Sequence, residues 1–222
     1  AMELAYFGAK VIHPQTMAPA VAKRIPIWIR NTFAPEKAGT LIHERTAPNP
    51  LVKGIATVEK IALLNLEGAG MIGVPGTAHR LFGALREEGI SVILISQGSS
   101  EHSICFAVPE VEAERAERVV RRAFDPELRE GQIQSVEVNH GCSILAVVGD
   151  GMAGAHGVAA QVSSAPRKPS LYVRAIAQGA SERNISVVID GRGSARALRS
   201  VHSSFYLSAH TVSIGLIGPG LV

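Results

Sequence analysis

The residues best suited to binding chemistry lie in two glycine-rich loops, each between an apolar run and a helical pattern. The first loop, residues 68–76, reads GAGMIGVPG, and the second, residues 149–157, reads GDGMAGAHG. Such a loop presents unpaired backbone N–H groups and the positive end of a helix dipole, which suits a carboxylate. Neither loop has the Gly-Lys-Ser/Thr ending of a phosphate-binding loop, which makes a nucleotide a poor candidate. The alternative, that the glycines only permit a tight turn, remains equally open.

Two glutamines form a second candidate pair. Gln97 lies in SQGSSEHSI (96–104) and Gln178 in AQGASERNI (177–185), each where a strand pattern ends and a hairpin turn begins. A neutral amide both donates and accepts hydrogen bonds, so it could bind the hydroxyl or amino group of a small polar ligand. The alternative is a turn residue that bonds the local backbone.

Both pairs of motifs repeat at one offset. An interval of 81 residues separates Met71 from Met152 and Gln97 from Gln178, and it also carries the glycines of the first loop onto those of the second. Because two separate motifs share this offset, the chain is predicted to contain two homologous modules of about 80 residues.

Each module has the hydrophobic pattern of a β-loop-α-β-β-α unit. Apolar periodicity predicts strands at 61–66, 90–96, 103–108 and 135–139 in the first module, with helices from 78 and over 110–124. In the second module it predicts strands at 143–148, 171–177 and 184–189, with helices from 158 and over 194–205. Pro166 should end the earlier of these two helices. This order is typical of the α/β (α+β) ferredoxin-like βαββαβ fold.

Both ends of the chain fit neither repeat. Residues 4–40 are predicted to be rich in loops, with one strand at 25–31. Residues 211–217 are an apolar run followed by Gly218-Pro-Gly220, which is the pattern of a strand leading into a Gly-x-Gly turn. We therefore interpret the chain as a piece of a larger protein.

Composition excludes several classes. With 46% apolar and 18% charged residues, the chain can bury a core. The net charge is only +3, and no basic face interleaved with aromatic residues is present, so we expect neither a nucleic-acid partner nor a membrane span. Cys105 and Cys142 lie in apolar runs, which argues against a disulfide framework and suits a reducing compartment. The histidines lack metal-ligand spacing, so no metal site is expected, and no secretory signal is visible.

Residues 3–14, ELAYFGAKVIHP, are similar to a motif near the end of aspartokinase catalytic domains, and 25–31 with 39–42 resemble the last strands of that domain. The two repeats resemble the paired ACT domains of aspartokinases, and 211–222 resembles the start of a dehydrogenase's dinucleotide-binding domain. The whole chain thus resembles the central region of bifunctional aspartokinase–homoserine dehydrogenases.

This resemblance implies a division of the chain. Residues 1–48 would end the kinase catalytic domain, 59–140 would form the first ACT domain, 49–58 with 141–210 the second, and 211–222 would begin the NAD(P)-binding domain of the dehydrogenase. The second repeat lacks its own fourth strand. By the resemblance, residues 53–57 cross over to complete it, so the two domains should interlock.

The resemblance also implies a function: binding of L-threonine for feedback inhibition of aspartate phosphorylation (a transferase) and homoserine formation (an oxidoreductase). The parent would use ATP with Mg and NAD(P). The chain itself would hold no cofactor and be inactive, because neither active site is complete. The expected effector-binding residues are Met71, Gly73, Val74, Thr77, Ser91, Ile93, Gln97, Ser99, Met152, Gly154 and Gln178. Lys10 and Val11 would approach the kinase nucleotide, and Gly218 and Gly220 the dehydrogenase cofactor.

Two alternatives remain open at this stage. The modules could be a dimerisation scaffold without a ligand, or they could sense another amino acid such as lysine or methionine. In either case ACT sheets usually pair at their edges, so a homodimer or larger homo-oligomer is expected, in the cytoplasm.

Overall fold

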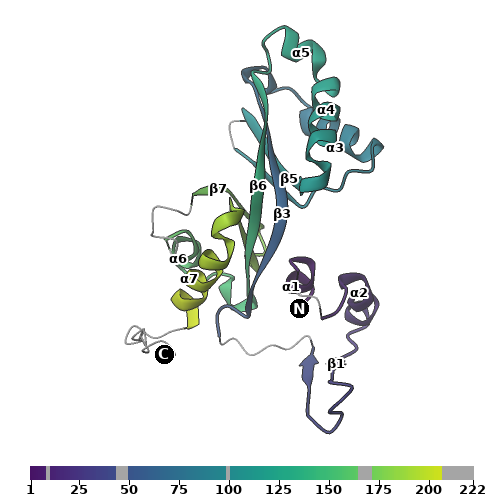
Figure 1. Cartoon of the computed structure of the whole chain (residues 1–222), viewed down its shortest axis with the longest axis vertical. Coiled ribbons are helices and arrows are strands. Elements are labelled where there is room, and N and C mark those ends of the chain that lie inside the picture. Colours follow the sequence, from purple (N-terminus) through teal and green to yellow (C-terminus); the bar gives the residue numbers. More distant parts are fainter. Residues whose placement is uncertain (9–10, 44–49, 99–100, 165–171, 207–222) are drawn as a thin grey trace, which may run out of the picture.

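The computed structural model describes residues 1–8, 11–43, 50–98, 101–164 and 172–206. In these residues the principal feature is a six-stranded antiparallel sheet with the order β4-β5-β3-β6-β8-β7. Its two central strands, β3 (Gly54–Glu67) and β6 (Ser135–Val148), are long and run through both modules (Figure 1). The sheet is therefore shared, and each module uses one half of each central strand.

The first module follows the predicted order. It consists of the second half of β3, then α3 (Thr77–Glu87), β4 (Leu94–Gln97), β5 (Ser103–Pro109), α4 (Ala113–Ala123), α5 (Asp125–Arg129) and the first half of β6. Leu81 and Leu85 of α3 and Val119 and Val120 of α4 are buried against Leu64 and Phe106 of the sheet. The helices thus cover one face of this half of the sheet, as Figure 1 shows beside the upper part of β3 and β6.

The second module repeats this arrangement. It consists of the second half of β6, then α6 (Val158–Ser164), β7 (Val173–Gln178), β8 (Asn184–Asp190) and α7 (Ser194–Tyr206). Val158 and Val162 of α6 and Ala197 and Val201 of α7 pack on Val187. In Figure 1 these two helices lie beside the lower part of the central strands.

The crossover strand is confirmed by the pairing of β3 with β6. Gly54–Val58 pairs with Ile144–Val148 in the second module, whereas Leu63–Glu67 pairs with Ser135–Asn139 in the first. Two register shifts separate the two stretches; the first, between Val58 and Ile61, is a bulge in β3 at Lys60, whose φ is +59°. Such a bulge adds one residue and bends the strand. The two modules are therefore interlocked through a single strand.

The same bulge explains how one face of β3 stays apolar along its length. Ala56 and Val58 before the bulge and Ile61 and Leu63 after it all belong to one apolar cluster. Because side chains alternate along a strand, the extra residue is needed to keep both stretches on the same face. We call this cluster the inter-module core, because both modules contribute to it together with Phe7 of the N-terminal region. Its members are Phe7, Ile61, Leu63, Leu94, Ala107, Cys142, Ile144, Ala146 and Val188, with Ala56, Val58, Ile93, Cys105, Ala175 and Ala177 packed against them.

Several predicted boundaries were wrong. The strands predicted at 135–139 and 143–148 form one continuous strand, β6. Residues 53–57 and 61–66 likewise belong to one strand, β3, except that Lys53 lies just before its start. The strand predicted at 90–96 begins only at Leu94. Residues 89–90 still belong to the turn that ends α3, because the Ile90 N–H donates to the Leu85 carbonyl (3.0 Å) and Gly89 has φ +69°.

The N-terminal region was predicted to be rich in loops, but it contains two helices, α1 (Met2–Tyr6) and α2 (Pro14–Ala22). A short hairpin of β1 (Ile27–Ile29) and β2 (Thr40–Ile42) follows them. Helix α1 has only five residues and no side-chain cap, and α2 contains an internal proline, Pro19, so neither gives a clear helical pattern. No helix in the described part of the chain is long and apolar enough to cross a membrane. The predicted strand and Gly-x-Gly turn at 211–222, with Gly218 and Gly220, lie outside the described residues.

Candidate ligand-binding sites

The first glycine loop borders a cavity of about 350 Å³ in the first module. The loop follows strand β3 and turns at Gly73 (φ +69°) and Gly76 (φ +90°) before α3 begins at Thr77. These angles lie in the left-handed region, which glycine adopts without strain. The hairpin between β4 and β5 supplies the opposite wall. The lining residues are Met71, Gly73, Val74, Pro75, Gly76, Thr77, Ala78, Gln97, Glu101 and Ile104.

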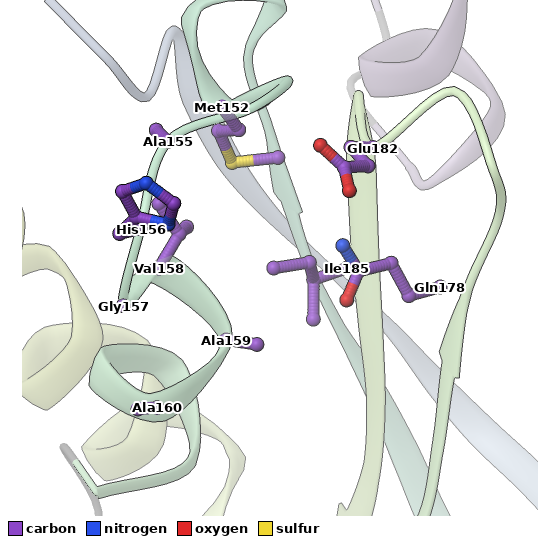
Figure 2. Close-up of a pocket in the computed structure, with 10 residues that line it drawn as sticks. All are labelled: Met152, Ala155, His156, Gly157, Val158, Ala159, Ala160, Gln178, Glu182 and Ile185. Carbon is purple, nitrogen blue, oxygen red and sulfur yellow. The ribbon is translucent and has the colours of Figure 1, made fainter.

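The second module has a matching cavity of about 340 Å³. Figure 2 shows its loop and helix-start residues on one side and Gln178 and Glu182 on the other, with Ile185 between them. All but one of its lining residues are the 81-residue equivalents of residues that line the first cavity. They are Met152, Ala155, His156, Gly157, Val158, Ala159, Ala160, Gln178, Glu182 and Ile185.

A glutamate reaches the glycine loop in each module. The Gly73 N–H donates to Glu101 Oε2 (2.9 Å), and the Gly154 N–H donates to Glu182 Oε2 (2.5 Å). Each glutamate also has a left-handed backbone, with φ +55° for Glu101 and +52° for Glu182, which is uncommon for a residue with a side chain. The two modules therefore place a carboxylate against the loop N–H in the same way.

The start of α3 adds donors to the first cavity. The Arg80 N–H is the first in the helix to bond back within it, to Gly76 O (2.9 Å), which leaves the N–H groups of the first turn without intrahelical partners. Thr77 and Ala78 in this turn line the cavity. The Thr77 hydroxyl donates to Val74 O (3.1 Å). This end of the cavity therefore suits an anionic group.

The two cavities differ at the helix start. Where the first has Val74, Pro75 and Thr77, the second has Ala155, His156 and Val158. Val158 offers no hydroxyl, and it is buried in the core that α6 and α7 cover in the second module. At this end the second cavity therefore has an imidazole in place of a proline and lacks the threonine hydroxyl, while its glutamine and glutamate are unchanged.

The structure brings together most of the predicted effector residues. Met71, Gly73, Val74, Thr77 and Gln97 line the first cavity, and Met152 and Gln178 the second. Gly154 adjoins the second through its N–H bond to Glu182.

Two other predicted effector positions do not line either loop cavity. Ser91 is exposed near the end of α3 and does not line the first cavity, and Ile93 packs against the inter-module core instead. Both positions were assigned to a strand that begins only at Leu94. Val11 is 70% exposed, and Ser99 and Lys10 lie outside the described residues.

Sequence reasoning missed the two glutamates. Glu101 and Glu182 occupy equivalent positions in the two hairpin motifs, so their repetition was a usable sign. Their role depends on a contact between residues 28 positions apart, which only the folded hairpin creates. Among the described residues, no group of three or more histidine, cysteine, aspartate or glutamate side chains could hold a metal ion.

Another cavity, of about 570 Å³, lies between the edge strands β4 and β7. We call it the inter-strand cavity. Gln97 and Gln178 line it as well as their own loop cavities, and Glu3 and Phe7 reach it from the N-terminal region. The other lining residues are Ile93, Leu94, Ile95, Ser96, Ile176, Ala177, Gly179, Ser181, Asn184 and Ser186. Residues of both candidate sites and of the N-terminal region therefore border this one cavity.

Comparison with known families defines the class. The ACT domain model matches residues 64–124 and 145–205, two stretches related by the same 81-residue offset. Together with the βαββαβ order of both modules, this match shows that the chain belongs to the ACT domain family.

Bifunctional enzymes are among the relatives of this chain. The chain is 48% identical, over its whole length, to "Bifunctional aspartokinase/homoserine dehydrogenase 1, chloroplastic" of Zea mays, and 44% identical, over 99% of its length, to the bifunctional aspartokinase/homoserine dehydrogenase of Haemophilus influenzae. It spans 25% and 27% of these relatives, respectively. It thus corresponds to about a quarter of the curated proteins it matches.

Solved structures agree on the fold. Aspartate kinase from Clostridium acetobutylicum matches with a TM-score of 0.79 and 26% identity, over 91% of this chain and 46% of that one. The ligand-free regulatory subunit of aspartate kinase from Thermus thermophilus matches with a TM-score of 0.57 and 30% identity, over 70% and 99%. Escherichia coli aspartokinase III in complex with lysine and aspartate (T-state) matches with a TM-score of 0.71 and 29% identity, over 92% and 44%. The chain is therefore similar to regulatory ACT regions of aspartokinases.

Proposed function

We propose that this chain is the allosteric sensor of a bifunctional aspartokinase/homoserine dehydrogenase and that its effector is L-threonine. The observation that carries the proposal is the duplicated cavity, in which a glycine loop faces a glutamine and a glutamate at equivalent positions of both modules. These groups match the three polar parts of a small hydroxylated amino acid. A volume near 350 Å³ is at the small end of the usual range for ligand sites.

The proposed pose assigns one partner to each group of the effector. The α-carboxylate lies at the glycine loop and the first turn of α3, the α-ammonium pairs with Glu101, and the hydroxyl bonds the amide of Gln97. Glu101 already accepts a hydrogen bond from the Gly73 N–H. Effector binding therefore replaces that bond with an ion pair between Glu101 and the ammonium group of the effector. Glu182 and Gln178 take the same roles in the second module.

Effector binding regulates the activity of the enzyme if the effector binds one arrangement of the enzyme more tightly than another. A ligand shifts an equilibrium only by its difference in affinity for the two states. Threonine would bind better to the inhibited arrangement and so reduce aspartate phosphorylation, which uses ATP with Mg, and homoserine formation, which uses NAD(P). Both cofactors belong to parts of the proposed parent outside this chain. The plant relatives are named as chloroplastic proteins. We therefore propose that the protein works in a reducing compartment, a plastid or a bacterial cytoplasm, which suits the free thiols of Cys105 and Cys142.

Calorimetry tests the effector directly. The chain should bind threonine in preference to lysine, methionine and isoleucine. Gln97→Ala with Gln178→Ala should weaken threonine binding roughly ten-fold, which corresponds to about 1.4 kcal/mol. The same variants should affect 2-aminobutyrate, which lacks the hydroxyl, much less. Equal affinity of threonine for the parent and the double variant would refute the role of the glutamines.

A second candidate function is a dimerisation scaffold that binds no effector. The edge strands favour it, because Ile95 of β4 is 48% exposed and Ile176 of β7 is 42% exposed. Edge strands with exposed apolar residues tend to pair with another chain. We therefore also propose a homodimer or larger homo-oligomer formed through the ACT sheets. Concentration-dependent sedimentation without any heat of binding from the four amino acids would favour the scaffold over the sensor.

A further inference from the structure

The N-terminal segment Met2–Phe7 lies against the junction of the two modules (Figure 1). The Phe7 side chain is only 5% exposed and belongs to the inter-module core. This core also contains Leu63 and Leu94 from the first module and Val188 from the second. One side chain from the N-terminal region therefore packs in a core that both modules build.

The segment fits the shared strand closely. At Gly54 an added Cβ would lie 2.7 Å from Leu4 Cδ1, so any larger residue there would force the Leu4 side chain to shift. At Gly8 (φ +99°) an added Cβ would lie 3.0 Å from the Thr57 carbonyl oxygen. Both contacts are to the first half of β3, the half that completes the second module. A hydrogen bond from Asn184 Nδ2 to Glu3 Oε2 (3.1 Å) ties the segment to β8 as well.

The same segment faces the inter-strand cavity. Glu3 and Phe7 line this cavity together with Gln97 and Gln178, the two glutamines of the candidate effector sites. Its walls, β4 and β7, are the two edges of the sheet and are not neighbours in its strand order. The Ser96 hydroxyl of β4 donates to Ile176 O of β7 (3.0 Å). Because no backbone ladder joins β4 to β7, their separation can change without breaking the sheet.

We propose that the segment Met2–Phe7 is the element through which effector binding at Gln97 and Gln178 reaches the kinase end of the chain. Phe7 and Glu3 act as positioning residues: they touch neither loop cavity but border the cavity between the strands that carry both glutamines. An effector that engages either glutamine alters the spacing of β4 and β7, and the side chain packed in the junction moves with it. This inference rests on the proposed effector function.

Hydrogen exchange of the 222-residue chain, measured by mass spectrometry with and without saturating threonine, tests the link. Threonine should change the exchange of residues 2–8 by about three-fold or more, although they lie outside both loop cavities. In Phe7→Ala this response should be lost while threonine affinity stays within about three-fold of the parent. Phe33→Ala is the matched control, because Phe33 is 97% exposed and should leave the response intact.

Two further variants separate the link from a folding defect. Phe7→Leu keeps an apolar side chain in the junction and should restore most of the response. Glu3→Ala removes the bond to Asn184 from an exposed position and should reduce the response in a chain that remains folded. Threonine binding with unchanged exchange at residues 2–8, or a full response in Phe7→Ala, would overturn the link alone. Calorimetry without any heat of threonine binding would overturn the effector function and the link together.

Discussion

Glu101 and Glu182 combine a left-handed backbone with a carboxylate that accepts a bond from a glycine loop. A left-handed non-glycine residue costs free energy and is retained where the surrounding structure compensates for it. The bond to the loop N–H is one such compensation, and it directs a negative charge toward the cavity in each module. This charge suits the ammonium group of an amino acid.

The negative charges of Glu101 and Glu182 should therefore determine how tightly threonine binds. Glu101→Gln with Glu182→Gln keeps a hydrogen-bond acceptor for each loop but removes the charge. Since a hydrogen bond to a charged group contributes roughly 1.5–3 kcal/mol, threonine should bind about 10-fold to 100-fold more weakly. Titration calorimetry measures the change, and circular dichroism checks the fold. Undiminished affinity in this double variant would remove both glutamates from the proposed pose.

Sequence reasoning found Gln97 and Gln178 because the amide type and the hairpin position are both visible in the repeat. It misplaced Ile93, since an apolar run does not show where α3 ends and β4 begins, and that boundary depends on the Gly89 turn. It missed Glu101 because the partner of the carboxylate, the Gly73 N–H, lies on a different element. Side-chain identity was thus predictable, but contacts between elements were not.

Among the elements, β3 is unusual because its two halves belong to different modules. Gly54–Val58 covers the edge of β6 over Ile144–Val148, and Lys53 adds a bond from its N–H to Val148 O (2.7 Å). Without this stretch, that part of β6 would have a partner on one side only. The missing fourth strand of the second repeat made the crossover predictable, whereas the bulge at Lys60 was not.

A chain that begins at Ile61 should consequently fail to unfold cooperatively, because it exposes the backbone groups of β6 and removes Ile55 from the core that α6 and α7 cover in the second module. Thermal unfolding followed by circular dichroism measures this. A chain that begins at Leu51 is the matched control: it also lacks α1 and α2 but keeps all of β3. Identical cooperative transitions in the two chains would show that the crossover strand is dispensable.

The turn after β8 contains an ion pair, between Asp190 and Arg192, that should make the stability of the fold depend on pH. Asp190 accepts hydrogen bonds from the Arg192 guanidinium (3.0 and 3.1 Å) and, with a smaller effect, from the Arg192 backbone N–H (3.0 Å). These contacts lower the pKa of Asp190 from 3.8 to about 2. A depressed carboxyl pKa contributes stability above its unfolded value, and that stability is lost as the pH falls toward the folded value. The unfolding free energy should therefore decline between about pH 4 and pH 2. In urea titrations across this window, Asp190→Asn should show a shallower decline than the parent, and parallel curves would contradict the assignment.

In the molecule as a whole, the internal repeat predicted a fold of two similar modules, because each motif occurs twice at one offset. The ACT domain family matches both copies. The repeat did not predict how the two copies meet. The approach of β4 to β7 and the burial of Phe7 between the modules bring together residues far apart in the chain. Apolar pattern shows that such residues are buried but not which other element covers them.

Two sites in one interlocked fold give a measurable stability effect. A ligand that binds only the folded state stabilises it by RT ln(1 + [L]/Kd), about 2.7 kcal/mol for each site at 100 times Kd. For a domain of this size, one such site should raise the melting temperature by roughly 5–10 °C, and two coupled sites by more. Because β3 and β6 run through both modules, the chain should melt in a single transition, and occupancy of either site should shift the whole transition. Differential scanning calorimetry with threonine should thus show one peak that moves, with Gln97→Ala and Gln178→Ala each removing part of the shift. Two peaks, of which threonine moves only one, would mean that the modules unfold separately despite the shared strands.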